Sequence, residues 1–510
     1  MKKLIAFSAI TAAAISAQAA QVEIRLNPSD SAPVIPKEIY GQFSEHLGTC
    51  IYGGLWVGED SPIPNTNGYR NDVLGALRDL HVPVLRWPGG CFADEYHWID
   101  GIGPKENRPR MVNNNWGGTV EDNSFGTHEF FNLCELIGCE PYLSGNVGSG
   151  SVEELAKWVE YITAESGPMA ERRMANGRQK PWRLKYLGVG NESWGCGGSF
   201  RVEYYADVYR RYQTYCRDYN GNHLFKIASG ANASDYNWTQ VMMQQAKDQM
   251  HGISMHYYAV DDWSNHGSAT KFTDDDYYKS LAICLVMEDI VKGHCRVMDE
   301  YDPQRKVALM VDEWGTWWDE EPGTIRGHLY QQNTMRDAMV AALTLNIFHN
   351  YTERVKMANI AQIANVLQAM VLTKDDKMVL TPTYYVFKMY AAHQDAKSIP
   401  VTTDTPERTA MEGRPAVPTI SATASEKDGK YTISVANTDL KEAQDITIDM
   451  SSIKAGKKVT GEILRAADIR DYNDFDAPDK IKTAAFDKAK IKGGKLTFTI
   501  PAASIITLTL

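Results

Sequence analysis

The sequence predicts an α/β protein, a (β/α)₈ TIM barrel with a C-terminal antiparallel β-sandwich domain. Eight short apolar runs, each ending in polar residues or glycine, alternate with helical patterns between residues 38 and 395. All twelve tryptophans lie between Trp56 and Trp318. From about Ser398 the chain changes to segments rich in threonine and lysine, in which apolar and polar residues alternate. These observations indicate two domains divided near residue 395.

The eight apolar runs have the length of strands. They cover residues 39–45, 82–89, 141–146, 185–192, 226–232, 253–258, 307–313 and 355–362. Helical patterns separate several of them, at 71–80, 152–162, 278–301 and 333–346. Eight such units in about 350 residues favour a closed barrel with enlarged loops over residues 38–395, because a doubly wound sheet usually has fewer strands.

Both ends of the chain contain alternating segments. Residues 431–435 and 496–500 alternate as strands with one buried face do. Short strands of this kind between turns favour a β-sandwich over residues 396–510. Residues 22–26 alternate in the same way. We therefore expect residues 21–37 to add an N-terminal strand to the sandwich.

The first twenty residues predict export. Lys2 and Lys3 precede an apolar stretch over residues 4–15, and Ala17-Gln18-Ala19 has the small-x-small pattern of a cleavage site. The alternative, a membrane anchor, needs about 20 apolar residues. We expect a signal peptide over residues 1–20 and a periplasmic or extracellular protein. No later segment has 18 uninterrupted apolar residues, so no membrane partner is expected.

Charge and motif content exclude several function classes. The chain has 53 Lys+Arg against 64 Asp+Glu, a net charge of −11, and no basic stripe for nucleic acid. Its eight cysteines are too dilute for a disulfide scaffold and form no C-x-x-C pair, which argues against structural zinc. Phosphate-loop, G-x-S-x-G and H-E-x-x-H motifs do not occur. No cofactor or metal is predicted.

Polar side chains gather at the carboxyl ends of the predicted strands, where a (β/α)₈ barrel carries its active site. Glu192 and Glu313 end the fourth and seventh runs, which face one another across the barrel. Paired carboxylates perform glycoside hydrolysis, in which one acid protonates the leaving oxygen and one carboxylate attacks or activates water. A single glutamate at a strand end is more often a salt-bridged loop residue, but two at these positions favour catalysis.

Several motifs then follow in order along the chain. They are IYGQFSEHLG at 39–48, RWPGG at 86–90, DGIGP at 100–104, GNE at 190–192, HYY at 256–258, DEW at 312–314 and ANIAQ at 358–362. This set resembles the α-L-arabinofuranosidases of glycoside hydrolase family 51, a family of the clan of retaining (β/α)₈ glycosidases. The resemblance runs through the whole chain after residue 20, whereas GNE alone would indicate only the clan.

The resemblance implies an exo-acting enzyme that releases terminal arabinofuranosyl residues from arabinose-containing polysaccharides or oligosaccharides. Glu192 resembles the general acid/base and Glu313 the nucleophile of a double displacement, which needs carboxyl groups about 5–5.5 Å apart. Asp312 is the rival nucleophile, but strand alternation predicts that its side chain points away from the face of Glu313. Relatives are often oligomeric, so a homo-oligomer is an assembly to test.

The resemblance also implies a set of sugar-binding residues, namely Glu45, Cys91, Asn191, His256, Tyr258, Trp317 and Gln362. Glu45, Asn191 and Gln362 should hold ring hydroxyls, Tyr258 should orient the nucleophile, and Trp317 should form a pocket wall. Cys91 stands where the family form has an asparagine. A thiol is a weak donor and a poorer acceptor, so this contact with the sugar is in question.

Structural alternatives stand beside several of these roles. His256 could be a hydrogen-bonded core histidine, and Trp116 could line the pocket or pack in the core. Arg86 fits a buried ion-pair partner of Glu45 or Glu313 better than a substrate ligand. For the whole protein, the alternatives are a glycosidase of the same clan with another substrate (endoglucanase or β-xylosidase) and a non-catalytic carbohydrate-binding barrel. The presence of both Glu192 and Glu313 disfavours the last.

Overall fold

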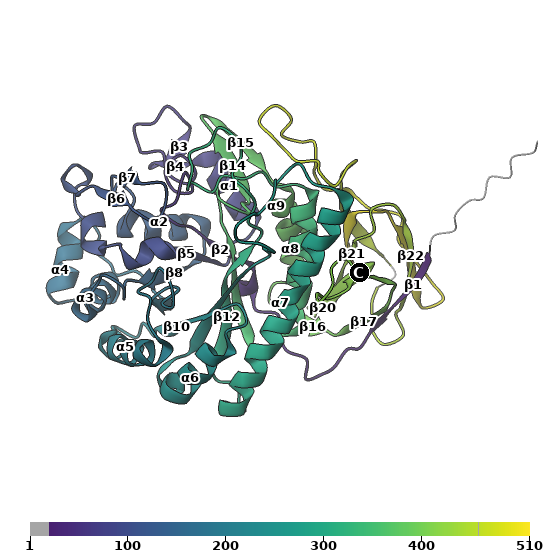
Figure 1. The fold of residues 1–510 in the computed structure, drawn as a ribbon, viewed down its shortest axis with the longest axis horizontal. Helices are drawn as coiled ribbons and strands as arrows, with labels where there is room; N and C mark the ends of the chain where they lie inside the picture. Colours follow the sequence, from purple (N-terminus) through teal and green to yellow (C-terminus); the bar gives the residue numbers. More distant parts are fainter. Residues whose placement is uncertain (1–19, 457) are drawn as a thin grey trace, which may run out of the picture.

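The computed structural model describes residues 20–456 and 458–510, and its larger part is a closed barrel of parallel strands (Figure 1). The barrel strands are β2 (Gly41–Phe43), β5 (Val84–Trp87), β8 (Glu140–Gly145), β9 (Tyr186–Val189), β10 (Phe225–Asn232), β11 (Gly252–Tyr258), β12 (Ala308–Gly315) and β13 (Val355–Ala361). They follow one another in chain order, and β13 pairs with β2 to close the ring. The predicted barrel is confirmed, and each predicted run overlaps one strand.

Helices surround this barrel on its outer side (Figure 1). They are α1 (Asn71–Asp79), α2 (Thr127–Ile137), α3 (Val152–Thr163), α4 (Pro168–Ala175), α5 (Val202–Tyr215), α6 (Tyr236–Ala246), α7 (Asp274–Tyr301), α8 (Met335–Asn350) and α9 (Pro382–Tyr390). Side chains that cap the first turn fix where several helices begin. At the start of α7, the Thr273 hydroxyl accepts from the Asp276 amide, and the Asp276 carboxylate accepts from the Thr273 amide.

Short hairpins enlarge three of the loops that follow barrel strands. They pair β3 (Asn65–Thr66) with β4 (Tyr69–Arg70), β6 (Met111–Asn113) with β7 (Thr119–Glu121), and β14 (Val371–Lys374) with β15 (Lys377–Leu380). These hairpins follow β2, β5 and β13 respectively. They therefore lie at the carboxyl end of the barrel, the end that carries the active site in this fold.

The C-terminal domain consists of two sheets of mostly antiparallel strands, as the sequence predicts. One has the order β17 (Val401–Asp404), β1 (Ala20–Leu26), β22 (Gln444–Asp449), β26 (Lys495–Ile500), β25 (Lys490–Lys492). The other has the order β16 (Lys397–Ile399), β20 (Ile420–Lys427), β21 (Lys430–Asn437), β27 (Ser504–Thr509), β23 (Thr460–Arg465), β24 (Ala484–Ala485). A separate pair joins β18 (Glu407–Arg408) to β19 (Val417–Pro418). Strand β1 pairs in parallel with β22 and antiparallel with β17.

Buried side chains from both sheets form the core of this domain. Ile24 and Ile448 come from one sheet, and Ile433 and Leu508 from the other. Each is fully buried. Because both sheets present apolar side chains to one shared core, their burial stabilises the domain.

Helix α8 lies between the barrel and the C-terminal domain (Figure 1). Buried hydrogen bonds join the barrel domain to the C-terminal domain. His349 at the end of α8 lies 2.9 Å from the Thr423 hydroxyl, and His393 contacts both Ser425 and Ser434. Leaving any of these groups unpaired would cost the free energy of a lost buried hydrogen bond. The contacts therefore fix how the two domains pack.

Residues 1–19, which hold most of the predicted signal peptide, lie outside the described residues. Among the residues that the structure describes, no helix combines the length and the apolar character needed to cross a membrane.

Candidate active site

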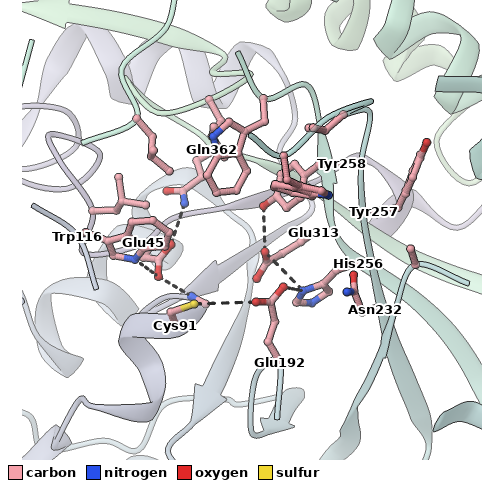
Figure 2. A pocket seen from close by; sticks show the side chains of 18 of the residues that line it. Glu45, Cys91, Trp116, Glu192, Asn232, His256, Tyr257, Tyr258, Glu313 and Gln362 are labelled. Atoms are coloured by element: carbon pink, nitrogen blue, oxygen red, sulfur yellow. Dashed lines mark hydrogen bonds and ion pairs between the residues drawn. The ribbon is translucent and has the colours of Figure 1, made fainter. Parts of the chain in front are cut away.

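A pocket of about 420 Å³ opens at the carboxyl ends of the barrel strands (Figure 2). Charged and polar side chains form its floor, and aromatic side chains form its walls. The lining residues are Glu45, Leu47, Gly90, Cys91, Trp116, Glu192, Trp194, Asn232, Ala233, His256, Tyr257, Tyr258, Val260, Trp263, Glu313, Trp317, Leu329, Gln362 and Leu367. Mostly apolar walls around a few convergent polar groups are typical of a small-molecule site.

Glu192 lies in a tight turn directly after β9. Its φ is +39° and that of Gly190 is +92°, so both occupy the left-handed region. Two amides close the turn, since Gly195 N and Gly197 N donate to the Glu192 carbonyl at 2.7 and 3.1 Å. A non-glycine residue in this conformation is uncommon, and such strain gathers at functional sites. The turn brings the Glu192 carboxylate into the pocket (Figure 2).

Glu313 is held by donors on three sides. Arg86 Nη1 donates to it at 2.8 Å, the Tyr258 hydroxyl donates at 2.9 Å, and His256 Nδ1 lies 3.5 Å away. Burial raises the pKa of the Glu313 carboxyl, while the charges of His256 and Arg86 oppose that rise. A Cβ at Gly90 would lie 2.8 Å from Glu313 Oε1, so only glycine fits beside this carboxylate.

His256 joins two carboxylates. Its Nδ1 lies 2.8 Å from Glu192 Oε1, and its Nε2 lies 3.0 Å from Asp312 Oδ1. Burial disfavours the charged ring, but the carboxylates of Glu313 and Asp312 outweigh it and raise the pKa of His256 to about 10. The imidazolium can donate from both nitrogens at once. His256 is therefore a hydrogen-bonded buried histidine that also lines the pocket.

Strand alternation predicts that the Asp312 side chain points to the opposite face of β12 from Glu313, but both carboxylates lie next to Arg86 and His256. The pairing register of β12 shifts near this residue on both sides, between Ser254 and His256 on β11 and between Val311 and Trp314 facing β13. Such irregularities re-aim side chains. The Asp312 carboxylate thus contacts His256, which Glu313 also approaches. It does not line the pocket, so Glu313 faces the ligand space and Asp312 lies behind it.

Glu45 sits in a cage of hydrogen-bond donors. Its Oε1 accepts from Gly90 N, Phe92 N and Trp116 Nε1 at 3.0, 3.1 and 3.0 Å, and its Oε2 accepts from Gln362 Nε2 at 3.0 Å. Burial and the nearby charge of Glu313 raise the pKa of Glu45 to about 7, against the effect of these donors. Arg86 pairs with Glu313 and not with Glu45.

Most of the predicted sugar-binding residues line the pocket, namely Glu45, Cys91, His256, Tyr258, Trp317 and Gln362. Asn191 lies behind it, buried, with its Oδ1 accepting from Arg86 Nη2 at 2.6 Å. Cys91 is bonded to Cys196 in a disulfide. Trp116 also lines the pocket, and its ring centre lies 6.5 Å from that of Trp317.

Sequence reasoning missed several residues around the site. Trp194 and Trp263 line the pocket, and Trp263, which is 61% exposed, packs edge-on against Trp317. The position of Trp194, two residues after Glu192, could have pointed to it. Asp94 accepts from the amides of Val147 and Asn191, and so ties together the loops after β5, β8 and β9. No pattern in the sequence marks this role.

A closed (β/α)₈ barrel with two glutamates facing one pocket at its carboxyl end is typical of a glycoside hydrolase. Comparison with known families agrees. Residues 76–277 match the alpha-L-arabinofuranosidase 1 domain, and residues 312–504 match the alpha-L-arabinofuranosidase C-terminal domain. The chain belongs to the α-L-arabinofuranosidases of glycoside hydrolase family 51.

Individual relatives share both sequence and fold. An intracellular exo-alpha-L-arabinofuranosidase of Bacteroides ovatus is 63% identical over 512 residues, which cover 100% of this chain and 99% of that protein. Alpha-L-arabinofuranosidase C of Emericella nidulans is 33% identical over 72% of this chain and 74% of its own. The crystal structure of the GH51 arabinofuranosidase from Xanthomonas axonopodis pv. citri is 47% identical, with a TM-score of 0.93 over 96% of this chain and 99% of its own.

The prediction of export is contradicted by one of these relatives. The Bacteroides ovatus protein aligns with the whole of this chain and is named intracellular. The prediction of a periplasmic or extracellular protein with a signal peptide over residues 1–20 is therefore wrong. It rested on the composition of a short basic and apolar segment, a pattern that does not by itself fix a compartment.

Proposed function

We propose that this pocket releases terminal α-L-arabinofuranosyl residues by a retaining double displacement, with Glu313 as nucleophile and Glu192 as general acid/base. The spacing of the two carboxylates carries the proposal. One oxygen of Glu192 and one of Glu313 lie within 4.8 Å of each other and of a His256 nitrogen. Retaining enzymes need carboxyl groups about 5–5.5 Å apart, whereas inverting enzymes need about 6.5–9.5 Å to admit a water.

In the first step, Glu313 attacks the anomeric carbon while Glu192 gives its proton to the leaving glycosidic oxygen. The product is a covalent arabinosyl enzyme. Arg86 and Tyr258 hold the Glu313 carboxylate in one orientation through hydrogen bonds of 2.8 and 2.9 Å. A nucleophile that is already oriented loses little freedom as it reacts.

In the second step, Glu192 takes a proton from water, and that water attacks the anomeric carbon from the side the leaving group vacated. The bond between the anomeric carbon and Glu313 breaks, which frees the Glu313 carboxylate and releases arabinose. Two inversions give net retention. The imidazolium of His256 donates to Glu192 and to Asp312. It therefore keeps the Glu192 carboxylate pointed at the same place in both steps.

The substrate class follows from the pocket and the relatives. Glu45 and Gln362 offer polar groups to ring hydroxyls, and Trp116 and Trp317 offer apolar faces to the sugar. Cys91 lines the pocket next to Glu192, and Asn191 acts on the site through Arg86. The Bacteroides ovatus relative is named exo-acting, and a Thermotoga maritima relative, 28% identical, was solved as an arabinose complex. We infer an arabinose-containing polysaccharide or oligosaccharide as substrate.

The remaining partners stay predictions. With a net charge of −11, the chain repels phosphate backbones, so no nucleic acid partner is expected, and no membrane partner is expected either. A homo-oligomer is predicted by the family resemblance alone. Light scattering of the purified protein checks this assembly directly.

Substitution of the two glutamates tests the mechanism. Glu313→Ala should abolish turnover of every substrate, because the nucleophile is needed whatever leaves. Glu192→Ala should still form the arabinosyl enzyme from a nitrophenyl arabinofuranoside, whose leaving group needs little acid assistance, but should hydrolyse it slowly. Added azide, which needs no base, should restore turnover and give an arabinosyl azide of retained configuration.

Two outcomes would contradict these assignments. Azide rescue of Glu313→Ala with an inverted product, with Glu192→Ala inactive, would exchange the two roles. Full activity of both variants would show that these two glutamates do not catalyse glycoside hydrolysis. A panel of aryl glycosides on the wild type separates arabinofuranosidase from β-xylosidase and glucanase activity.

A further inference from the structure

The Cys91–Cys196 disulfide lies against the carboxylate proposed as general acid/base. Cys91 follows β5 and Cys196 lies in the loop after β9, 105 residues later. Glu192 Oε2 is 3.9 Å from Cys91 Sγ and 3.5 Å from Cys196 Sγ. Figure 2 shows the Cys91 sulfur directed at Glu192. Two sulfurs and one carboxylate oxygen thus converge within 4.8 Å of one another.

We infer that reduction of this disulfide creates an inhibitory site for a soft divalent cation of the Zn²⁺ class, with Cys91, Cys196 and Glu192 as ligands. Thiolates and carboxylates are both established zinc ligands. Tetrahedral zinc, with about 2.3 Å to sulfur and about 2.0–2.2 Å to oxygen, separates sulfur and oxygen ligands by about 3.5 Å. The two sulfur–oxygen distances already lie near that value.

The two sulfurs must move apart to about 3.8 Å to share one tetrahedral ion. The exposed side chain of Cys196 can rotate away, and the backbone before it at Gly195 has open space, whereas Gly197 after it packs against Asn191. A Cβ at Gly195 would meet only the Glu192 carbonyl, at 3.7 Å. Solvent reaches Cys196, so water can fill a fourth position on the ion. The site would then be open on one side.

A phosphine can reduce the Cys91–Cys196 disulfide. The phosphine takes oxygen from water and becomes its oxide, and the disulfide takes the two electrons and two protons to become two thiols. Binding of the cation then releases both thiol protons, since thiolates are the ligands. The inhibition, which rests on the proposed role of Glu192, follows because a carboxylate that binds the ion cannot donate a proton to the substrate.

Cadmium binding to the whole protein tests the site without any catalysis. The protein is treated with tris(2-carboxyethyl)phosphine, freed of the reductant without air, and titrated with Cd²⁺ while its ultraviolet thiolate-to-metal absorption is recorded. We expect the reduced wild type to bind one Cd²⁺ more than the unreduced protein. Cys91→Ser and Cys196→Ser should each lose this ion. Cys139→Ser, which removes a partly buried cysteine outside the pocket, should keep it.

Activity measurements then test inhibition. Zn²⁺ should inhibit the reduced wild type at least tenfold more strongly than the unreduced protein, and a chelator should reverse the effect. In Glu192→Gln, Cd²⁺ affinity should fall at least tenfold. Equal Cd²⁺ binding by the reduced wild type and both serine variants would overturn the site, as would equal Zn²⁺ inhibition before and after reduction. Strong Cd²⁺ binding at this site without loss of activity would instead contradict the catalytic role proposed for Glu192.

Discussion

At the scale of single residues, His256 and Asp312 control the charge around Glu192. Asp312 contacts His256 Nε2, accepts from the Tyr142 hydroxyl at 2.6 Å, and lies 3.7 Å from Arg86 Nε. It has no access to the pocket. Its negative charge is one reason why His256 keeps its proton. We therefore regard Asp312 as a positioning residue that acts through His256.

Asp312→Asn should lower the pKa of His256 from about 10, because one of the carboxylates that stabilise the imidazolium becomes neutral. The ring then loses its proton at a lower pH and can no longer donate to both neighbours. We expect kcat/KM to fall roughly 10–150-fold, as for a lost charged hydrogen bond of about 1.5–3 kcal/mol. The alkaline limb of the pH profile should move to lower pH.

Tyr142→Phe is the matched control for this substitution, because it removes a hydrogen bond to Asp312 and leaves the charge in place. It should leave the alkaline limb near its wild-type position. An Asp312→Asn profile that superimposes on the wild type would show that Asp312 has no influence on His256.

The raised pKa of Glu45 makes a separate prediction about stability. The folded group titrates near pH 7 and the unfolded group near its usual value of about 4.3. Between these values only the folded state keeps the proton, so the free energy of unfolding falls as pH rises from about 4.3 to 7. Glu45→Gln cannot ionise and lacks this loss. The difference in Tm between variant and wild type should therefore shift in favour of the variant as pH rises from 5 to 7.5.

Glu45→Gln is a suitable test because a glutamine can keep the hydrogen bonds at this position. Gly90 N, Phe92 N and Trp116 can still donate to the amide oxygen. Gln362 Oε1 has no hydrogen-bond partner in the wild type, so a rotated Gln362 amide can accept from the new nitrogen. A Tm difference that does not change with pH would contradict the raised pKa.

At the scale of elements, the barrel strands could be predicted because both of their faces are buried and they read as continuous apolar runs. The residues at their ends followed from the same pattern. The orientation of Asp312 could not be predicted, since it depends on register shifts between β12 and its two neighbours. The disulfide could not be predicted either, because Cys91 and Cys196 are 105 residues apart and meet only when the loops after β5 and β9 come together.

The loop after β11 carries Trp263, which was missed because a tryptophan among polar loop residues has no periodicity. Its exposed ring lies at the rim of the pocket against Trp317. Trp263→Ala should raise KM for an arabino-oligosaccharide several-fold, as for a lost stacking contact of about 1 kcal/mol. Inhibition by free arabinose should change little, because we expect a single sugar to bind beside Glu313 and not at the exposed rim.

Tyr204→Ala provides the control for loss of an exposed aromatic residue. Tyr204 is 55% exposed on α5 and does not line the pocket. This variant should keep the wild-type KM. Equal effects of the two substitutions would argue against a role of Trp263 in substrate binding.

At the scale of the whole molecule, we expect the C-terminal domain to brace the barrel without supplying a catalytic group. None of the pocket-lining residues comes from beyond residue 367. Ending the chain at residue 395, where the domain boundary is predicted, would expose the part of α8 that packs on β20, β21 and β27, and would leave β1 without partners. The yield of soluble protein and its Tm should drop sharply. A well-folded shortened chain with an intact pocket but no activity would contradict this role.

The pairing of β1 also bears on the order of events during synthesis. Ile24 lies opposite Ile448, so the first described strand leaves the ribosome about 420 residues before its parallel neighbour. At about 5–20 residues per second, it waits roughly 20–80 s with both edges open. The barrel can close during that interval. The earliest strand among the described residues is thus among the last to pair, and until then its open edges could pair with another chain.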